Sequence, residues 1–246
     1  MAYTLDLTGK VALITGATRG LGYAMAMAFA DAGADIIVSS RKAEACEKVA
    51  AEVRALGRRA LAAPCHVGYW DQIEALVEKA YAEFGRVDVL VNNAGLSPTA
   101  PSSVDVTEAL FDKIIDINFK GPFRLCALVG SRMAAGDGGS IINVSSLGAL
   151  SPKSIYLAYA GAKAALNTLA AGFVDEFSPK VRINTLSPGQ FATDIAEAWG
   201  DARPTQPLGR YGEPHEIVGA ALYLASDASS YTTGANIGIG GGIRAS

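Results

Sequence analysis

The chain has 246 residues, of which 50% are hydrophobic and 18% are charged, with a formal net charge of −3. This composition can bury a substantial core, and with no basic block it argues against nucleic acid as a partner. No apolar run reaches the roughly 18 residues that a membrane span requires, so we expect no membrane partner. The odd number of cysteines, without a C-x-x-C spacing, argues against a disulfide framework and a metal site. We therefore expect a cytoplasmic protein without a bound metal.

Short runs rich in Val and Ile predict strands that are buried on both faces. They are Val11–Thr15, Asp35–Ser39, Val87–Asn92, Ser140–Ser145, Val181–Leu186 and Asn236–Ile239. The stretches between them have the length of helices, which predicts an α/β fold with a doubly wound parallel sheet and helices on both faces. We expect a single domain over residues 1–246. The least regular stretch, Thr193–Pro207, follows a strand, and we expect a short substrate-covering segment there.

The first predicted strand runs into a glycine-rich turn, TGATRGLG, which a predicted helix over Tyr23–Ala32 follows. Glycines let such a turn approach a ligand closely, and the N–H groups of the next helix suit a pyrophosphate. The strand, turn and helix together predict a Rossmann-like dinucleotide-binding unit. The expected contacts are Gly16, Thr18, Arg19, Gly20, Leu21 and Gly22. A tight turn that binds nothing is the alternative interpretation.

The end of the second predicted strand indicates which dinucleotide is preferred. About 20 residues after the glycine turn, an acidic residue would bind the adenosine ribose of NAD. This chain has Ser40, Arg41 and Lys42 there instead, and Arg19 lies in the turn itself. Cations at these positions suit a 2′-phosphate, so we expect NADP(H), with NAD(H) as the alternative. Alternatively, Arg41 and Lys42 are merely solvated side chains at the start of a helix and bind no cofactor.

Several motifs in this order resemble those of the short-chain dehydrogenase/reductase family. The glycine turn resembles the T-G-x-x-x-G-x-G of that family, Asn92–Gly95 (NNAG) its second signature, and Ser187–Gly189 (SPG) the segment that holds the nicotinamide. The family's catalytic tetrad is matched by the following residues. They are Asn118, Ser146, Tyr159 and Lys163. Tyr159 and Lys163, in YAGAK, are four residues apart and share a helix face.

The resemblance implies an oxidoreductase that transfers a hydride between NADP(H) and a carbonyl compound or secondary alcohol. Tyr159 would act as general acid or base, with Ser146 holding the carbonyl oxygen and Asn118 positioning a water. Lys163 would contact the ribose, and we expect its ammonium group, together with the positively charged oxidised nicotinamide, to lower the pKa of the Tyr159 phenol. Further cofactor contacts follow from the same motifs. They are His66, Val67, Asn93, Ala94, Gly95, Pro188, Gly189, Phe191 and Thr193.

His66 departs from the family pattern, which often has at this position an aspartate that contacts the adenine. A neutral imidazole can hydrogen-bond to the adenine or stack on it. A histidine that merely ends a strand is an equal alternative.

Other functions are compatible with the same motifs. A 3-oxoacyl-carrier reductase would need cations for an acidic carrier, for which Lys180, Arg182 and Arg132 are the candidates. An NAD-dependent polyol or sugar dehydrogenase is also possible. A non-catalytic NADP(H)-sensing regulator belongs to a different class, and the complete tetrad argues against it.

Two apolar stretches, Leu110–Met133 and Ile155–Phe177, indicate self-association. A single helix face can pack on the sheet, so the remaining apolar faces need another cover. We expect a homo-oligomer in which these stretches pair across a two-fold axis. The family resemblance implies a homotetramer.

Overall fold

A computed structural model describes residues 5–193 and 206–243. Its centre is a parallel sheet in the strand order β3-β2-β1-β4-β5-β6-β7. The strands are β1 (Val11–Thr15), β2 (Asp35–Ser39), β3 (Ala60–Ala62), β4 (Val89–Asn92), β5 (Gly139–Val144), β6 (Val181–Pro188) and β7 (Asn236–Ile239). The strand order reverses between β1 and β4, and ligands bind beside such a switch point, at the carboxyl ends of the strands.

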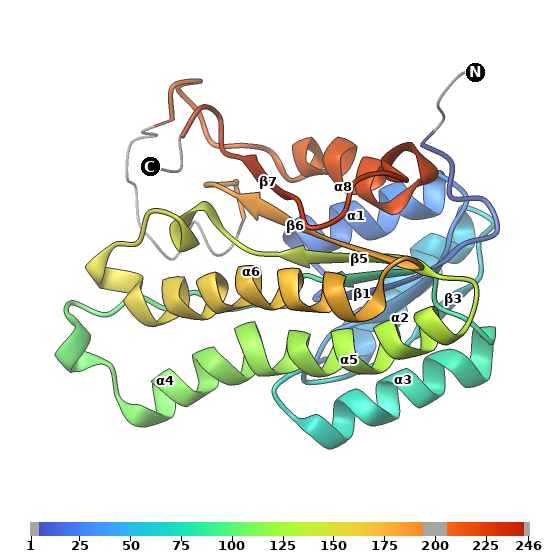
Figure 1. Ribbon diagram of the computed structural model, residues 1–246, viewed down its shortest axis with the longest axis horizontal. Coiled ribbons are helices and arrows are strands. Elements are labelled where there is room, and N and C mark those ends of the chain that lie inside the picture. The colour runs from blue at the N-terminus through green and yellow to red at the C-terminus, as the bar shows by residue number, and fades with distance from the viewer. Residues whose placement is uncertain (1–4, 194–205, 244–246) are drawn as a thin grey trace.

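Helices cover both faces of the sheet. They are α1 (Gly20–Asp31), α2 (Ala43–Ala55), α3 (Trp70–Phe84), α4 (Glu108–Ile115), α5 (Gly121–Ala135), α6 (Leu157–Phe177) and α8 (Val218–Ala225). Helices α1, α2 and α8 pack on one face, and α3, α5 and α6 pack on the other. Figure 1 shows α1 and α8 above the sheet and α3, α5 and α6 below it. The expected doubly wound α/β fold is confirmed.

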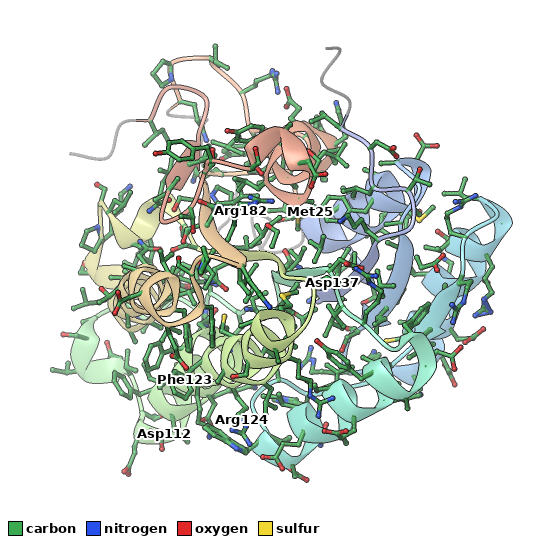
Figure 2. The ribbon with its side chains drawn as sticks, turned by 45° about the vertical axis from the view of Figure 1, so that its right-hand side comes forward. Met25, Asp112, Phe123, Arg124, Asp137 and Arg182 are labelled. Atoms are coloured by element: carbon green, nitrogen blue, oxygen red, sulfur yellow. The ribbon has the colours of Figure 1, made fainter. Side chains whose placement is uncertain are left out.

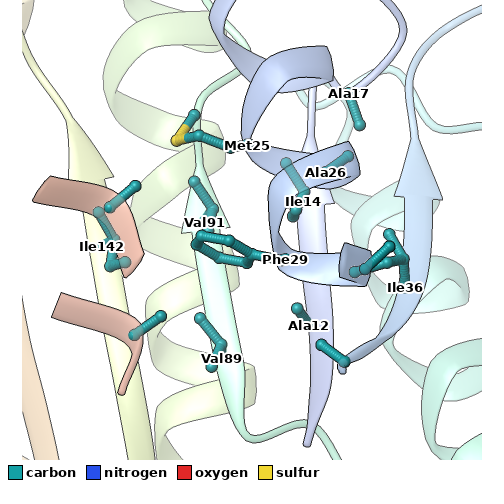
Figure 3. Packing of buried hydrophobic residues seen from close by; sticks show 14 of the residues in the cluster. Ala12, Ile14, Ala17, Met25, Ala26, Phe29, Ile36, Val89, Val91 and Ile142 are labelled. Atoms are coloured by element: carbon teal, nitrogen blue, oxygen red, sulfur yellow. The ribbon is translucent and has the colours of Figure 1, made fainter. Parts of the chain in front are cut away.

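Alternate residues of the strands face opposite helix layers, as the period of a strand requires. On the α1 face, the ring of Phe29 is completely buried and lies over Val89 and Val91 of β4 (Figure 3). Burying a side chain of this kind stabilises the fold by about 1.5–3 kcal/mol. This packing fixes α1 across β1 and β4, so that the N-terminus of the helix lies at the carboxyl end of β1.

The boundaries differ from the sequence prediction at several points. Strand β3 was not predicted, because its three residues, Ala60–Ala62, are too few and too weakly apolar to give a signal. Helix α1 begins at Gly20, within the glycine turn, rather than at Tyr23. The remaining predicted strands are present, with shifts of one or two residues at the ends of β4, β5 and β6. In the described part of the chain, no helix combines the length and apolar character that crossing a bilayer needs.

Candidate active site

The turn after β1 is shaped for close approach of a ligand. Gly16 and Gly20 have φ angles of +64° and +54°, a region that side chains disfavour. A Cβ atom at Gly16 would lie 2.9 Å from Asn93 Nδ2, and one at Gly22 would collide with the Gly16 carbonyl oxygen. The N-terminus of α1 has no side-chain cap and no acidic residue in its first turn. This glycine cradle, with uncapped N–H groups beside it, fits the pyrophosphate of a dinucleotide.

The end of β4 is tied to the glycine turn by a network through Thr15. The Thr15 hydroxyl accepts hydrogen bonds from the backbone N–H groups of Asn93 (3.0 Å) and Ala94 (3.1 Å). In return, Asn93 Nδ2 donates to the carbonyl oxygens of Thr15 (2.9 Å) and Gly16 (3.2 Å). The expected residues Asn93 and Ala94 therefore lie beside the glycine cradle. The sequence analysis missed Thr15, although a threonine that ends a buried strand before a glycine was a usable signal.

Asn118 lies in a π-helix, Asp116–Lys120, that joins α4 to α5. Its side chain is fully buried, and Nδ2 donates to the carbonyl oxygens of Leu96 (2.9 Å) and Ile114 (3.0 Å). Its Oδ1 accepts from the Leu96 N–H at 3.3 Å. Both N–H groups of the amide are therefore used by backbone carbonyls, so the side chain anchors the loop after β4 to the α4–α5 junction. Such π-turns occur frequently at functional sites.

Ser146, Tyr159 and Lys163 meet at the carboxyl end of β5. The Ser146 hydroxyl accepts from the Gly148 N–H at 3.0 Å and is hydrogen-bonded to Tyr159. Lys163 is only 3% exposed, donates to the Val144 carbonyl oxygen at 2.7 Å, and has its Nζ 5.9 Å from the centre of the Tyr159 ring. The sequence prediction that these three side chains converge agrees with this geometry.

Gly95 connects this group to the loop after β4. A Cβ atom at Gly95 would lie 2.9 Å from Asn118 Oδ1 and 3.5 Å from Lys163 Nζ. The absence of a side chain therefore lets the loop pass directly over both residues, which brings the four expected catalytic residues together.

Burial dominates the titration of the two central groups. It raises the pKa of Tyr159 to about 12, although the hydrogen bond from Ser146 acts in the opposite direction. Burial also lowers the pKa of Lys163 to about 8. In the protein chain alone the Tyr159 pKa is thus raised rather than lowered, because loss of hydration outweighs any nearby positive charge. The expected lowering, which includes the charge of a bound oxidised nicotinamide, stays a prediction for the complex. At neutral pH the phenol stays protonated and can donate its proton.

Tyr156 is a further side chain at this site that the sequence analysis missed. Its ring packs edge-on against the Tyr159 ring, with the centroids 6.4 Å apart and the planes at 83°. Burial raises the pKa of its phenol as well. Tyr156 precedes Tyr159 by three residues, a spacing that places two side chains on the same helix face. This spacing could have predicted Tyr156 as a neighbour of Tyr159.

The segment after β6 returns to the glycine turn. The Gly189 N–H donates to the Ile239 carbonyl oxygen at 2.9 Å, and Phe191 is buried where it pairs with Gly212. The methyl group of Thr193 lies 3.4 Å from the place a Cβ atom of Gly20 would take. The expected contacts from Pro188 to Thr193 thus lie between β6 and α1. Most of the expected substrate-covering segment, residues 194–205, lies outside the described residues.

The carboxyl ends of β2 and β3 lie on the other side of the glycine turn from β5 and Tyr159. Thr18 Oγ1 donates to Ser40 Oγ at 3.0 Å, and the Ser40 carbonyl oxygen accepts from the Cys65 N–H at 2.9 Å. His66 and Val67, which follow Cys65, are thereby placed next to β2. Arg41 is exposed, and among residues 5–193 and 206–243 it has neither an ion pair nor a hydrogen bond.

Two expected contacts behave differently from the rest. Leu21 packs against the core on the α1 face, so only its backbone can contribute to the turn. Arg19 is exposed and occupies the N-cap position of α1.

Comparisons with known proteins agree with this geometry. The short chain dehydrogenase family model matches residues 10–204. Dehydrogenase/reductase SDR family member 4 of Homo sapiens is 36% identical over 96% of this chain and 88% of its own length. A 7α-hydroxysteroid dehydrogenase complexed with NADH and 7-oxo glycochenodeoxycholic acid has a TM-score of 0.91 and 33% identity, covering 100% of this chain and 99% of that chain. A 3-oxoacyl-(acyl-carrier-protein) reductase of Agrobacterium tumefaciens with NADP bound has a TM-score of 0.90 and 32% identity, covering 97% and 96%.

The sheet order and the glycine cradle, together with these matches, bear out what the motifs implied about ancestry and class. The chain belongs to the short-chain dehydrogenase family and is an NAD(P)-dependent oxidoreductase.

Proposed function

We propose that the protein interconverts a carbonyl compound and a secondary alcohol, with a preference for NADP(H). The observation that carries this proposal is the partly buried Tyr159 side chain, with its phenol hydrogen-bonded to Ser146 and its ring beside the Lys163 ammonium. A protonated phenol next to a second hydroxyl forms a pair of donors for one carbonyl oxygen. The bound cofactor supplies the hydride to the carbonyl carbon, or accepts it in the reverse direction.

The side chains would divide the proton chemistry as follows. In reduction, Ser146 donates a hydrogen bond to the carbonyl oxygen, and Tyr159 transfers its proton to that oxygen as the carbon gains the hydride. The product is an alcohol and the residue left behind is a phenolate, which the Lys163 ammonium stabilises. Lys163 is held in place by its bond to the Val144 carbonyl oxygen. Oxidation of the alcohol runs the same steps backwards, with the phenolate as base.

The preference for NADP(H) is supported by the end of β2. The residue there is Ser40, whose hydroxyl is hydrogen-bonded to Thr18 of the glycine turn, and Arg41 comes directly after it. Neither residue is an acid that could bind the ribose hydroxyls of NAD. The exposed Arg41 guanidinium, together with Arg19, is suited to a 2′-phosphate, since guanidinium groups bind phosphates through paired hydrogen bonds. A hydrogen bond to a charged group contributes about 1.5–3 kcal/mol.

The test is turnover of uncharged ketones with NADPH and of secondary alcohols with NADP⁺, followed by cofactor absorbance. We expect turnover of at least part of such a panel, and its loss in Tyr159→Phe with cofactor binding retained. Binding of NADPH without turnover of any ketone or alcohol would contradict the proposal and favour a cofactor sensor.

A carrier-bound substrate is less well supported, because the cations considered for it are already engaged. Arg182, a partly buried residue of β6 that is labelled in Figure 2, donates to the carbonyl oxygens of Leu224 (3.0 Å) and Ser226 (3.2 Å). Lys180 donates to the Gly136 carbonyl oxygen at 3.0 Å. Arg132 is paired with a glutamate of α3 and stacks on the ring of Tyr81. These contacts favour a free small molecule over an acidic carrier protein.

We also propose that the protein assembles as a homotetramer through α4, α5 and α6. Exposed apolar side chains lie on these helices, namely Phe111, Phe123 and Leu157, and Ile155 is exposed in the turn just before α6. Part of the apolar surface expected to need a partner is covered within the subunit, since Leu166, Phe173 and Phe177 are buried. Phe123 of α5, labelled in Figure 2, contacts Phe173 of α6 with centroids 5.7 Å apart. Light scattering at micromolar concentration should give a tetramer mass; an active monomer would contradict this.

A further inference from the structure

His66 follows β3 at the edge where the ends of β2 and β3 meet. The Cys65 N–H donates to the Ser40 carbonyl oxygen, so His66 follows a residue that is bonded to the end of β2, where the Ser40 hydroxyl accepts from Thr18 of the glycine turn. The His66 backbone N–H donates to Gln72 Oε1 at 2.8 Å, and its carbonyl oxygen accepts from the Tyr69 N–H at 3.0 Å. The backbone of His66 is therefore fixed on both sides by α3 and by the turn that leads into it.

The orientation of the imidazole ring is fixed by the next glycine. The Gly68 N–H donates to His66 Nδ1 at 3.1 Å. A Cβ atom at Gly68 would lie 3.0 Å from His66 Cε1 and 3.1 Å from Nδ1, so the imidazole packs more tightly on this glycine than it could beside most other residues. The Tyr69 ring covers one side of the imidazole, with centroids 4.6 Å apart and the planes at 38°.

This contact determines which ring nitrogen carries the proton. An N–H group donates only to a nitrogen with a free lone pair, so Nδ1 is unprotonated and the neutral ring carries its proton on Nε2. Nε2 has no hydrogen-bond partner within the part of the chain that the structure describes. The nearby carboxylate of Asp116 is paired with Lys120 at 2.5 Å, which leaves the imidazole edge without a charged partner from that helix.

We propose that His66 recognises the adenine ring of the cofactor as a hydrogen-bond donor, through Nε2–H to one of the adenine ring nitrogens. This inference rests on the proposed placement of the cofactor, with its adenosine beyond the ends of β2 and β3. The edge of adenine offers an amine as donor and the nitrogens N1, N3 and N7 as acceptors. A carboxylate at this position would bind the amine; an imidazole with this tautomer binds an acceptor instead. His66 is thus a specificity-determining residue that selects a purine with a ring nitrogen facing it.

The test uses ADP and its 1-deaza, 3-deaza and 7-deaza analogues, each of which replaces one ring nitrogen by a C–H group. Binding to the unmodified protein is measured by calorimetry, without any turnover. We expect one analogue alone to bind about three- to tenfold more weakly than ADP, the value of one hydrogen bond. Equal binding of all four nucleotides would overturn the proposal.

A matched variant assigns the effect to the imidazole. His66→Asn keeps an oxygen that can accept from the Gly68 N–H but has no donor in the place of Nε2. The variant should bind ADP about three- to tenfold more weakly and should no longer distinguish the sensitive analogue from ADP. If His66→Asn still binds the sensitive analogue about three- to tenfold more weakly than ADP, the donor to that ring nitrogen is another group of the protein, and the proposal is wrong. A third outcome combines two results: the variant binds ADP more weakly, and the unmodified protein binds all the analogues equally. That outcome would indicate stacking of the imidazole on adenine and would overturn the proposed hydrogen bond.

The tautomer itself is measurable without any variant of His66. The chain has two histidines, and His215→Gln identifies the signals of His66 in a ¹⁵N-labelled sample. At alkaline pH we expect the ¹⁵N shifts of an unprotonated Nδ1 and a protonated Nε2; the opposite pair of shifts would contradict the proposal. Because ADP lacks the nicotinamide, these results are independent of whether the protein reduces ketones.

Discussion

The two ends of the carboxyl edge of the sheet differ in how much water reaches their functional side chains. Beside β5, Asn118 is fully buried and Lys163 is 3% exposed, and both are held by backbone carbonyls. Beside β2, Arg41 is exposed and has no partner in the described part of the chain. Burial shifts the pKa values of Tyr159 and Lys163 beside β5, whereas phosphate recognition beside β2 needs only a cation that stays charged.

This difference predicts how variants at the two ends should behave. Changes beside β5 should alter rate, proton uptake and stability together, because the same buried contacts carry all three. Changes beside β2 should alter the choice of cofactor and leave the fold intact, since exposed side chains contribute little to stability.

The largest effect is expected from Tyr159→Phe, which removes the proton donor and keeps the ring. Turnover should fall by about 10²–10⁴-fold, the usual contribution of general acid catalysis. Cofactor binding should persist. Tyr156→Phe is the matched control, because that ring packs edge-on against Tyr159, and it should cost less than about tenfold. Near-normal kcat in Tyr159→Phe on the best substrate would contradict the role of Tyr159.

Lys163→Met should reveal the buried ammonium through the pH dependence of stability. The pKa of Lys163 is lowered from 10.5 to about 8, so between these values the unfolded chain binds more protons than the folded one. The free energy of unfolding of the unmodified protein, relative to the variant, should therefore rise by about 3 kcal/mol from pH 8 to pH 10.5. Below pH 8 the difference should be constant.

Chemical denaturation at several pH values measures this difference. Lys48→Met, at an exposed position on α2, is the control and should show no such slope. A difference between the unmodified protein and Lys163→Met that stays flat across the window would show that the amine is not buried as described.

A smaller effect is expected at the β2 end. Arg41→Ala should raise the KM for NADPH by about tenfold or more and change the KM for NADH little, because only NADPH has a 2′-phosphate. Combining Ser40→Asp with Arg41→Ala should invert the preference, since the carboxylate repels the phosphate and accepts from the ribose hydroxyls. Lys48→Ala is the control for the general loss of a cation. Equal increases in KM for both cofactors in Arg41→Ala would refute selection by this residue.

Much of the architecture could be predicted because it depends on local signals. The strands β1 and β2 consist of consecutive apolar residues, and Gly16, Gly20 and Gly22 mark the turn where backbone conformation restricts the residue type. Ser146, Tyr159 and Lys163 could be assigned to one site because Ser146 follows the end of a predicted strand, and Tyr159 and Lys163 are spaced to share one helix face.

Other features depend on tertiary contacts that no local pattern carries. Strand β3 is defined by its pairing with β2 rather than by its three alanine-rich residues. At the π-helix, the Asn118 amide bonds to backbone carbonyls of two different segments, the loop after β4 and α4. The direction of the Tyr159 pKa shift depends on burial, which the pairing of a tyrosine with a lysine in sequence does not reveal.

The most direct test of cofactor selection by the β2 end is kcat/KM for NADPH and for NADH in the unmodified protein, on a single ketone. The exposed Arg41, the hydroxyl of Ser40 and the lack of an acid at this position predict a value for NADPH that is higher by about one to two orders of magnitude. Equal values for the two cofactors, or a higher value for NADH, would contradict it.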